Sequence, residues 1–268
     1  MLNLLVNWTT VAIVVAIVAV IAIVFAILIV LVSKLCFVKE DEKIEKTLSH
    51  LAGANCGGCG FNGCADFAKA LVEKRADLSM CGPSSAEDKK EISKILDIPF
   101  EEEVPSFAVV KCSGGDDCKN KFIYVGNDGC VAQHFVMGGT KNCTNGCLGG
   151  GTCETACPYH AISVKNGVAV ADKATCASCG LCKRNCPKQL IELIPKTAKV
   201  YVACSSHCKG KDVMDSCKKG CIGCTLCAKN CPENAITMVD NLPVIDYSKC
   251  SGCLTCVAKC PRKTIKEL

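Results

Sequence analysis

The pattern of apolar and polar positions divides the chain into one long apolar run and a polar remainder. Residues 8–32 are apolar apart from Thr9 and Thr10, and no charged side chain precedes Lys34. As a helix this run would be about 37 Å long, which exceeds the roughly 30 Å hydrocarbon core of a bilayer. A helix that is apolar on every face is a poor candidate for a soluble domain. We therefore predict a single tilted membrane span within residues 1–36.

Charge around this run predicts its orientation. A cleaved signal peptide would have a basic start and a shorter apolar stretch, and this segment has neither. The first basic residues, Lys34, Lys39, Lys43 and Lys46, all follow the run. By the positive-inside rule, the remainder of the chain is expected on the cytoplasmic side of the cell membrane. Cys36 is interpreted as an ordinary interfacial residue, with lipidation as the alternative.

The polar remainder begins with three amphipathic patterns. Residues 40–50 and 65–76 both place apolar side chains at helical spacing. Ser84 and Glu87 have the spacing of a capping box, which predicts a third helix start. The apolar positions that define these helix faces are Ile44, Leu48, Leu51, Phe67, Ala70, Leu71, Ile92, Ile95 and Leu96. A small helical domain is predicted over residues 37–98.

Cysteines within this domain follow the pattern Cys-x2-Cys-x4-Cys-x16-Cys, at Cys56, Cys59, Cys64 and Cys81. The neighbouring glycines would let the backbone approach a metal centre and direct N–H groups at its sulfurs. We predict a [4Fe–4S] cluster here, with structural zinc as the alternative.

Three further runs read Cys-x2-Cys-x2-Cys-x3-Cys-Pro, beginning at Cys176, Cys221 and Cys250. In bacterial ferredoxins this spacing gives three thiolates to one [4Fe–4S] cluster, while the fourth crosses to a neighbouring cluster. Disulfide frameworks do not repeat this spacing, and a zinc site does not need it. Iron–sulfur clusters that carry single electrons are therefore predicted.

An internal repeat with an offset of 74 organises the carboxy-terminal half. Residues 143–187 superpose on 217–261, including both Cys-Pro steps and the Ala-Ile that follows the first step. In a bacterial ferredoxin that connection is a short helix and a small antiparallel strand pair. We predict two tandem two-cluster ferredoxin-like units, residues 143–198 and 199–268. Residues 99–142 are expected to form a linker and a small strand-containing segment.

One position breaks the repeat, because Gly150 stands where the second copy has Cys224. We interpret Cys143, four residues before Cys147, as the replacement ligand, with the flexible glycines 149–151 accommodating it. A three-iron cluster or a missing cluster is the alternative for this unit.

The crossing rule then assigns twenty cysteines to five [4Fe–4S] clusters. The predicted sets are Cys56, Cys59, Cys64 and Cys81; Cys143, Cys147, Cys153 and Cys186; Cys176, Cys179, Cys182 and Cys157; Cys221, Cys224, Cys227 and Cys260; and Cys250, Cys253, Cys256 and Cys231. The cysteines left over are Cys112, Cys118, Cys130, Cys204, Cys208 and Cys217. These are expected to be free buried thiols.

Two alternatives concern the leftover cysteines. Cys112, Cys118 and Cys130 would form a sixth metal site, but they lack a good fourth ligand. Cys130 and Cys204 are also 74 residues apart, which suggests a shared structural reason for an upstream cysteine in each copy.

Composition refines the fold class. Cysteine accounts for 27 of 268 residues and aromatic residues for 5%, so units held by metal replace a large apolar core. The predicted class is α+β, small and metal-dominated, behind one transmembrane helix. The formal charge of +5 would become about −5 with five clusters bound, because each carries about −2 with its thiolates. A basic nucleic-acid-binding protein is thereby excluded.

Together these features resemble the B subunits of Rnf complexes, which are ion-translocating ferredoxin:NAD⁺ oxidoreductases. The resemblance rests on the apolar anchor, on the Asn-Cys-Gly-Gly-Cys-Gly-Phe-x-Gly-Cys motif at 55–64 and on the glycine-rich loop 138–153. It implies that the chain accepts electrons from reduced ferredoxin and relays them to membrane and flavin-bearing subunits that move Na⁺ or H⁺. It implies no catalytic residue in this chain. The loop 138–153 is similar to that of clostridial-type members, which supports Cys143 as a ligand, and the second ferredoxin unit exceeds the minimal family pattern.

Two other functions are weighed against this one. A membrane-tethered polyferredoxin that serves a hydrogenase or another dehydrogenase is the first, although such a protein would need only the Cys-Pro runs. A non-redox scaffold is the second.

Donor ferredoxins are generally acidic, so the basic residues of the last unit are candidates for a docking surface. The alternative is a solvated face that balances the charge of the clusters. The residues are Lys209, Lys211, Lys218, Lys219, Arg262, Lys263 and Lys266.

Overall fold

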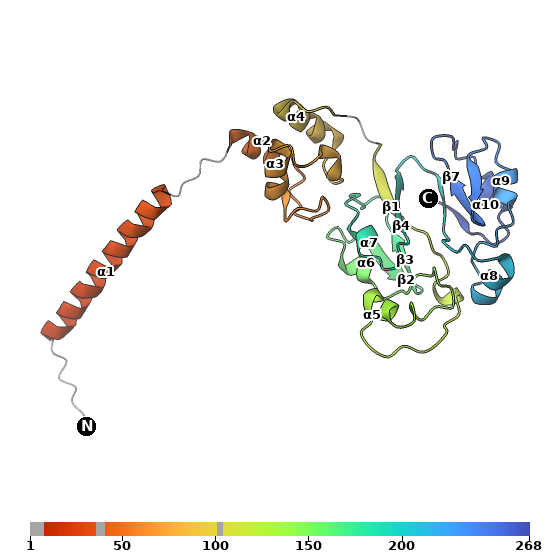
Figure 1. Ribbon diagram of the computed structural model, residues 1–268, viewed down its shortest axis with the longest axis horizontal. Helices are drawn as coiled ribbons and strands as arrows, with labels where there is room; N and C mark the ends of the chain where they lie inside the picture. Colours follow the sequence, from red (N-terminus) through yellow and green to blue (C-terminus); the bar gives the residue numbers. More distant parts are fainter. Residues whose placement is uncertain (1–7, 36–40, 101–103) are drawn as a thin grey trace, which may run out of the picture.

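The computed structural model describes residues 8–35, 41–100 and 104–268 (Figure 1). Helix α1 (Trp8–Leu35) stands apart from the rest of the chain, and its apolar stretch has no buried residue. From Val11 to Lys34 it is long and apolar enough to cross a membrane, by length and composition. So much apolar surface is unfavourable in water, which suggests that α1 is a membrane anchor. The interpretation of Cys36 lies outside the described residues.

A small helical domain follows α1. It contains α2 (Glu42–Ser49), α3 (Cys64–Val72), the 3₁₀ turn η1 (Leu78–Met80) and α4 (Ala86–Leu96). Their apolar faces form one core around the buried side chains of Phe67, Leu71 and Ile92. The helices predicted from the three amphipathic patterns are therefore confirmed, although α3 ends four residues earlier than predicted.

The start of α4 differs from the predicted capping box by one residue. The N-cap is Ser85, whose hydroxyl accepts a hydrogen bond from the N–H of Asp88 at 3.1 Å. Ser84 is buried instead, where its hydroxyl accepts the N–H of Ala52 and lies 3.2 Å from the sulfur of Cys81. The prediction of Ser84 and Glu87 was wrong because packing beside a cysteine takes the Ser84 hydroxyl away from the helix end.

The remaining residues form two repeats of similar design. The first repeat contains β1 (Ser106–Val110), the 3₁₀ turn η2 (Gly115–Asp117), α5 (Cys130–Phe135), α6 (Thr152–Thr155), β2 (Ile162–Lys165), β3 (Val168–Ala171), α7 (Leu181–Arg184) and β4 (Ile191–Pro195). The second contains β5 (Val200–Val202), α8 (Gly210–Ser216), α9 (Leu226–Lys229), β6 (Ile236–Val239), β7 (Leu242–Ile245), α10 (Thr255–Lys259) and β8 (Ile265–Glu267). The antiparallel pair expected after each Ala-Ile is present, as β2–β3 and β6–β7.

A second strand pair closes each repeat. β1 pairs with β4 in antiparallel register, and β5 pairs with β8 in the same way. Residues 106–110, expected in a linker and strand-containing segment, are thus part of the first repeat itself.

The first strands of the two repeats, β1 and β5, are followed by corresponding residues. β1 leads into Cys112 and β5 into Cys204, each two residues after its strand and each followed by a serine. These cysteines are 92 residues apart, whereas the later cysteine loops are 74 apart. The first repeat therefore carries 18 additional residues (92 − 74) between its first strand and its first cysteine loop.

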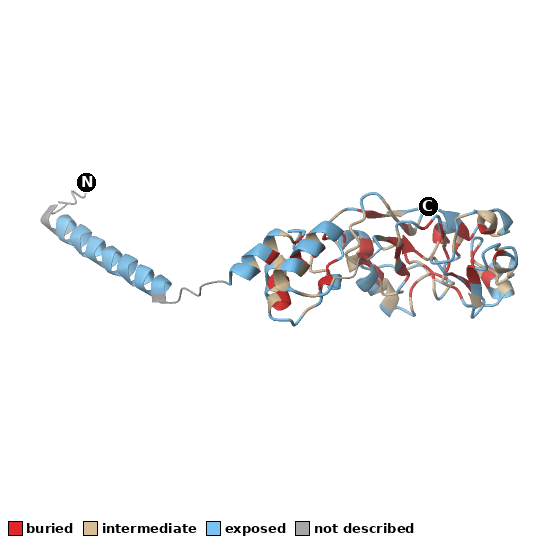
Figure 2. Ribbon diagram, turned by 90° about the horizontal axis from the view of Figure 1, so that it is seen from above, coloured by how far each residue is buried: buried red, intermediate tan, exposed pale blue. Residues whose placement is uncertain are grey.

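Each repeat has a thin core in which cysteine side chains take a large share. Cys153, Cys157 and Cys182 are buried members of the first core, while Cys227 and Cys256 belong to the second. Figure 2 shows the buried stretches running through these repeats between exposed loops. Because apolar contacts are few, metal bound by these thiols would supply much of the folding energy.

Replacing Ile92 by alanine tests the packing of the first domain. The side chain is 0% exposed, so Ile92→Ala should lower the free energy of unfolding by about 2–5 kcal/mol through lost burial and a residual cavity. Anaerobic urea unfolding would measure the change. Ile123→Ala is the matched control, because Ile123 is 92% exposed and its removal should have an effect within about 0.5 kcal/mol. Equal effects would contradict this account of the core.

Candidate metal centres

Four cysteines of the first domain gather beside α3. Cys56 and Cys59 lie in the loop before this helix, Cys64 begins it, and Cys81 follows η1. The N–H of Gly58 donates to the sulfur of Cys56 at 3.4 Å. Such backbone N–H donors are the usual surroundings of cluster-bound thiolates.

The Cys-Pro runs build similar groups in the repeats. Cys182 has the thiols of Cys176, Cys179 and Cys157 as its neighbours, which is the set that the crossing rule predicts, and the N–H of Ala108 donates to the Cys176 sulfur at 3.4 Å. In the second repeat, one pocket is lined by Cys221, Cys224, Cys227 and Cys260. Cys250 and Cys253 surround Cys256, and Cys231 packs against the same core.

The structure separates Cys143 from the three cysteines with which it was predicted to hold a cluster. The pocket formed by Cys147, Cys153 and Cys186 has Cys130 as its fourth cysteine, and Cys143 lines a different cavity. This pocket is the counterpart of the one lined by Cys221, Cys224, Cys227 and Cys260 in the second repeat. Cys130 therefore stands in for the cysteine that the repeat lacks at position 150.

Backbone geometry explains this substitution. A Cβ atom on Gly150 would lie 2.1 Å from the carbonyl oxygen of Asp128 and 2.7 Å from the nitrogen of Cys130. Glycine is thus the residue that lets the additional segment approach. The N–H of Cys130 donates to the Thr152 hydroxyl at 2.9 Å, which fixes the start of α5 beside the cysteine loop.

The sequence contained a signal for Cys130 that the offset of 74 concealed. The interval from the first strand to the first cysteine loop is 18 residues longer in the first repeat, and the additional segment carries a cysteine. The match between Cys130 and Cys204 is coincidental, because Cys112 is the structural counterpart of Cys204.

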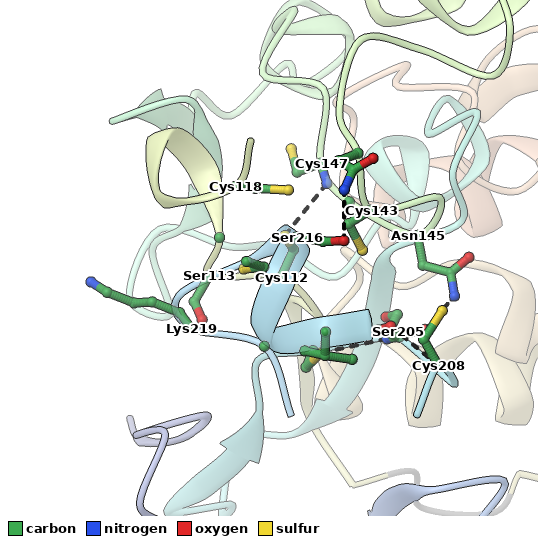
Figure 3. A pocket seen from close by; sticks show the side chains of 18 of the residues that line it. Cys112, Ser113, Cys118, Cys143, Asn145, Cys147, Ser205, Cys208, Ser216 and Lys219 are labelled. Carbon is green, nitrogen blue, oxygen red and sulfur yellow. Dashed lines mark hydrogen bonds between the residues drawn. The ribbon is translucent and has the colours of Figure 1, made fainter. Parts of the chain in front are cut away.

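Most of the leftover cysteines converge on one cavity between the two repeats (Figure 3). Its volume is about 300 Å³. The cysteines that line it are Cys112, Cys118, Cys143, Cys147, Cys204, Cys208 and Cys217. Five of these seven were expected to be free buried thiols, whereas Cys143 and Cys147 were predicted to be cluster ligands. The structure brings all seven to one cavity, where Cys208 is exposed rather than buried.

The chemistry of the thiols bears on which metal group they could hold. Among the described residues, no three Cys, His, Asp or Glu side chains are close enough to share one ion. A tetrahedral zinc site would hold its sulfurs about 3.8 Å apart, whereas a four-iron cube holds them farther apart at its corners. All described cysteines are free thiols, with no disulfide among them. Sets of free thiols that accept hydrogen bonds from backbone N–H groups, as at Cys56, Cys176 and Cys186, have the donor chemistry that fits [4Fe–4S] clusters.

Burial makes these thiols weak acids before metal binds. It raises the pKa of Cys143 and Cys182 to about 11 and that of Cys153 to about 12. At Cys217 a hydrogen bond from the Cys118 thiol lowers the pKa to about 6 and raises that of Cys118. Cys143, Cys153 and Cys182 are thus protonated at neutral pH and would release protons on binding iron.

Proton release makes cluster retention depend on pH. Protons compete with iron for thiols whose pKa is raised, so their affinity for iron falls as the pH falls. We expect faster loss of iron to a chelator at about pH 6.5 than at about pH 8.5, measured anaerobically from the fading of cluster absorption. A loss rate that is the same at both values would contradict this expectation.

The first domain and the first repeat bring two cysteine sets side by side. A Cβ atom on Gly58 would lie 2.7 Å from the carbonyl oxygen of Cys179, and the Arg184 guanidinium donates to the carbonyl of Gly57 at 2.7 Å. The buried hydroxyl of Tyr159 sits beside Cys56, and its pKa is raised to about 12 by burial and nearby thiols. Clusters in these two sets would be neighbours.

Several sets of four cysteines, surrounded by N–H donors and placed behind an apolar helix, define a multi-cluster iron–sulfur protein. Residues 51–83 match the family model described as a putative Fe-S cluster, and residues 220–264 match the 4Fe-4S dicluster domain.

Curated relatives cover most of the chain. It is 40% identical to the B subunit of the ion-translocating oxidoreductase complex of Methanosarcina acetivorans over 224 residues, 83% of this chain and 85% of the relative. It is 37% identical to the B subunit of the Na⁺-translocating ferredoxin:NAD⁺ oxidoreductase complex of Acetobacterium woodii, over 82% of this chain and 67% of the relative. It is 38% identical to the B subunit of the proton-translocating ferredoxin:NAD⁺ oxidoreductase complex of Clostridium ljungdahlii, over 75% of this chain and 72% of the relative.

The chain belongs to the family of B subunits of ion-translocating oxidoreductase complexes, as its motifs indicated. It is accordingly an iron–sulfur electron-transfer subunit of a multi-subunit complex.

Proposed function

We propose that this protein accepts electrons from reduced ferredoxin at its second repeat and passes them through the first repeat to the first domain. From there they would reach partner subunits of a Na⁺- or H⁺-translocating ferredoxin:NAD⁺ oxidoreductase, the activity printed in the names of two relatives. The observation that carries this direction is exposure. Cys224 and Cys253 are exposed, whereas the corresponding cysteines of the first repeat are buried or half-buried.

The carriers we propose are [4Fe–4S] clusters in a helical domain and two tandem ferredoxin-like units. Four of the ligand sets we propose are those predicted from the sequence. For the first repeat we propose Cys130, Cys147, Cys153 and Cys186, which line one pocket. When bound, such clusters carry one electron at a time. The chain fixes their separations, excludes water from most of them and tunes their potentials through N–H donors to sulfur.

The order of the sites supports a relay in one direction. The second repeat carries the exposed ligands, the first repeat follows, and the set at Cys56 adjoins the set at Cys179. The first domain is also the part of the chain that follows α1. We propose that the cluster-bearing residues lie on the cytoplasmic side, because Lys34, Lys43 and Lys46 follow the apolar span.

The basic residues of the second repeat do not all serve as a docking surface. Lys219 forms an ion pair with Asp117 at 3.2 Å. The Arg262 guanidinium donates to the carbonyl oxygen of Cys217 at 2.6 Å and to that of Gly220 at 3.3 Å. These two side chains therefore help to hold the structure. The exposed members that remain are Lys209, Lys211, Lys218, Lys263 and Lys266.

Charge reversal tests the uptake of electrons at this surface. Lys218 and Lys263 flank the contact between Arg262 and Cys217, so they lie on one part of the surface. Lys218→Glu with Lys263→Glu should slow reduction by an acidic ferredoxin about 10-fold at low salt, with a smaller effect at high salt. Anaerobic stopped-flow absorption would measure the rate.

The matched control is Lys69→Glu with Lys90→Glu, which makes the same charge change on exposed residues of the first domain. Equal rates for the two double variants at low salt would contradict docking on the second repeat.

Removal of one thiol tests the revised ligand set. Cys130→Ser should convert the cluster of the first repeat to a three-iron form or abolish it, because an alcohol is a poorer iron ligand than a thiolate. Electron-spin-resonance spectra and iron content would detect either change. Cys208→Ser is the control, since Cys208 is exposed and outside every proposed set. Unchanged spectra of Cys130→Ser would contradict the assignment.

A further inference from the structure

The cavity between the repeats has an internal symmetry in its cysteines. Cys112 and Cys204 each follow the closing strand of their repeat, and Cys143 and Cys217 each precede the first cysteine loop by four residues. Each repeat thus contributes one pair of thiols from equivalent positions. The remaining lining cysteines outside the loops, Cys118 and Cys208, have no such counterparts.

The hydrogen bonds at these thiols resemble those of the other cysteine sets. The N–H of Cys147 donates to the Cys112 sulfur at 3.4 Å, and the N–H of Cys221 donates to the Cys204 sulfur at the same distance. The sulfur of Cys204 also accepts the N–H of Ser206 at 3.5 Å. Backbone N–H groups of Asn145 and of Lys219 and Gly220 lie against the sulfurs of Cys143 and Cys217.

Contacts between the repeats hold the cavity open. The Asn145 amide donates to the carbonyl of Ser205 at 2.9 Å, and the Asn142 amide donates to the Ser216 hydroxyl at 2.7 Å. The Ser205 hydroxyl in turn donates to the carbonyl of Lys111 at 2.9 Å. These bonds fix the two thiol pairs relative to each other.

Two cations flank the cavity, one from each repeat. Lys141 is buried, and its ammonium donates to the carbonyl of Gly115, which lines the cavity, at 3.0 Å. No carboxylate among the described residues lies within ion-pair distance of it. Arg262 from the second repeat bonds the backbone of Cys217. A buried ammonium without an anion is costly, and a bound group of charge about −2 would offset that cost.

We propose that this cavity holds a sixth [4Fe–4S] cluster that joins the two repeats. Its ligands are Cys112, Cys143, Cys204 and Cys217. Cys118 is the competitor for a corner, but it pairs with Cys217 across a β-bridge and has its thiol against the same sulfur. The Cys118 thiol also donates to the carbonyl oxygen of Lys119 at 3.7 Å, and Cys208 is exposed.

The cluster has a place in the relay, and this inference rests on the proposed function. Cys112 is hydrogen-bonded to Cys147 of the first repeat, and Cys204 to Cys221 of the second. A reduced cluster at Cys221 would return from the 1+ to the 2+ state as the bridging cluster takes one electron. The bridging cluster would then return to 2+ by reducing the cluster at Cys147. No proton or other reactant is needed.

Iron content and electron count test the proposal on the full chain, purified anaerobically. With six clusters we expect about 24 iron and 24 sulfide per chain and about six one-electron equivalents in a reductive titration. About 20 iron and five equivalents would overturn the bridging cluster and leave the proposed relay through five clusters standing. Iron far below either value would overturn the relay itself.

Variants locate the cluster. Cys112→Ser with Cys204→Ser removes one ligand from each repeat and should lower iron by about four per chain. Cys208→Ser and Cys118→Ser should keep the wild-type content. Loss of one zinc rather than four irons, or iron unchanged in the double variant, would overturn the assignment. If the double variant fails to load the other clusters, the electron count of the wild-type chain decides.

Discussion

The bond between cysteine thiolates and iron is the interaction on which the soluble part of this protein depends. Its aromatic content is low, and its cores are thin assemblies in which thiols occupy positions that Leu or Ile would fill elsewhere. Backbone N–H groups donate to sulfurs in these sets, as at Cys56, Cys176, Cys186 and Cys260. Without metal, such a core would expose protonated thiols and poorly paired backbone groups, so assembly of the clusters and folding of the chain are coupled.

This coupling explains how the chain tolerates changes in its loops. The first repeat lacks a cysteine at Gly150, yet four thiols still meet there because a longer segment supplies Cys130. The two repeats share the positions of four cysteine sulfurs around equivalent pockets, and they differ in the chain segment that supplies one of these sulfurs. The same longer segment carries Cys118 to the boundary between the repeats and pairs it with Cys217.

The arrangement also suits movement of electrons over a distance. Adjacent sets are linked by short backbone contacts, as between Gly58 and Cys179, and by hydrogen bonds to sulfur, as between Cys221 and Cys204. Two cysteines of the proposed sets, Cys224 and Cys253, are exposed in the second repeat, whereas those of the first repeat are buried or half-buried, which limits where an external donor can approach. A family of complexes that couples redox chemistry to ion movement requires such controlled access.

The sequence alone determined the features that depend on local spacing. The Cys-x2-Cys-x2-Cys-x3-Cys-Pro runs, the pattern from Cys56 to Cys81 and the apolar run of α1 each specify their chemistry within a few turns of chain. Only the tertiary structure decided which thiol lies with Cys147, Cys153 and Cys186, and that Cys112, Cys143, Cys204 and Cys217 gather at one cavity. Spacing along the chain does not encode this gathering, because it depends on contacts between the repeats, such as the bridge between Cys118 and Cys217 and the hydrogen bond from Asn145 to Ser205.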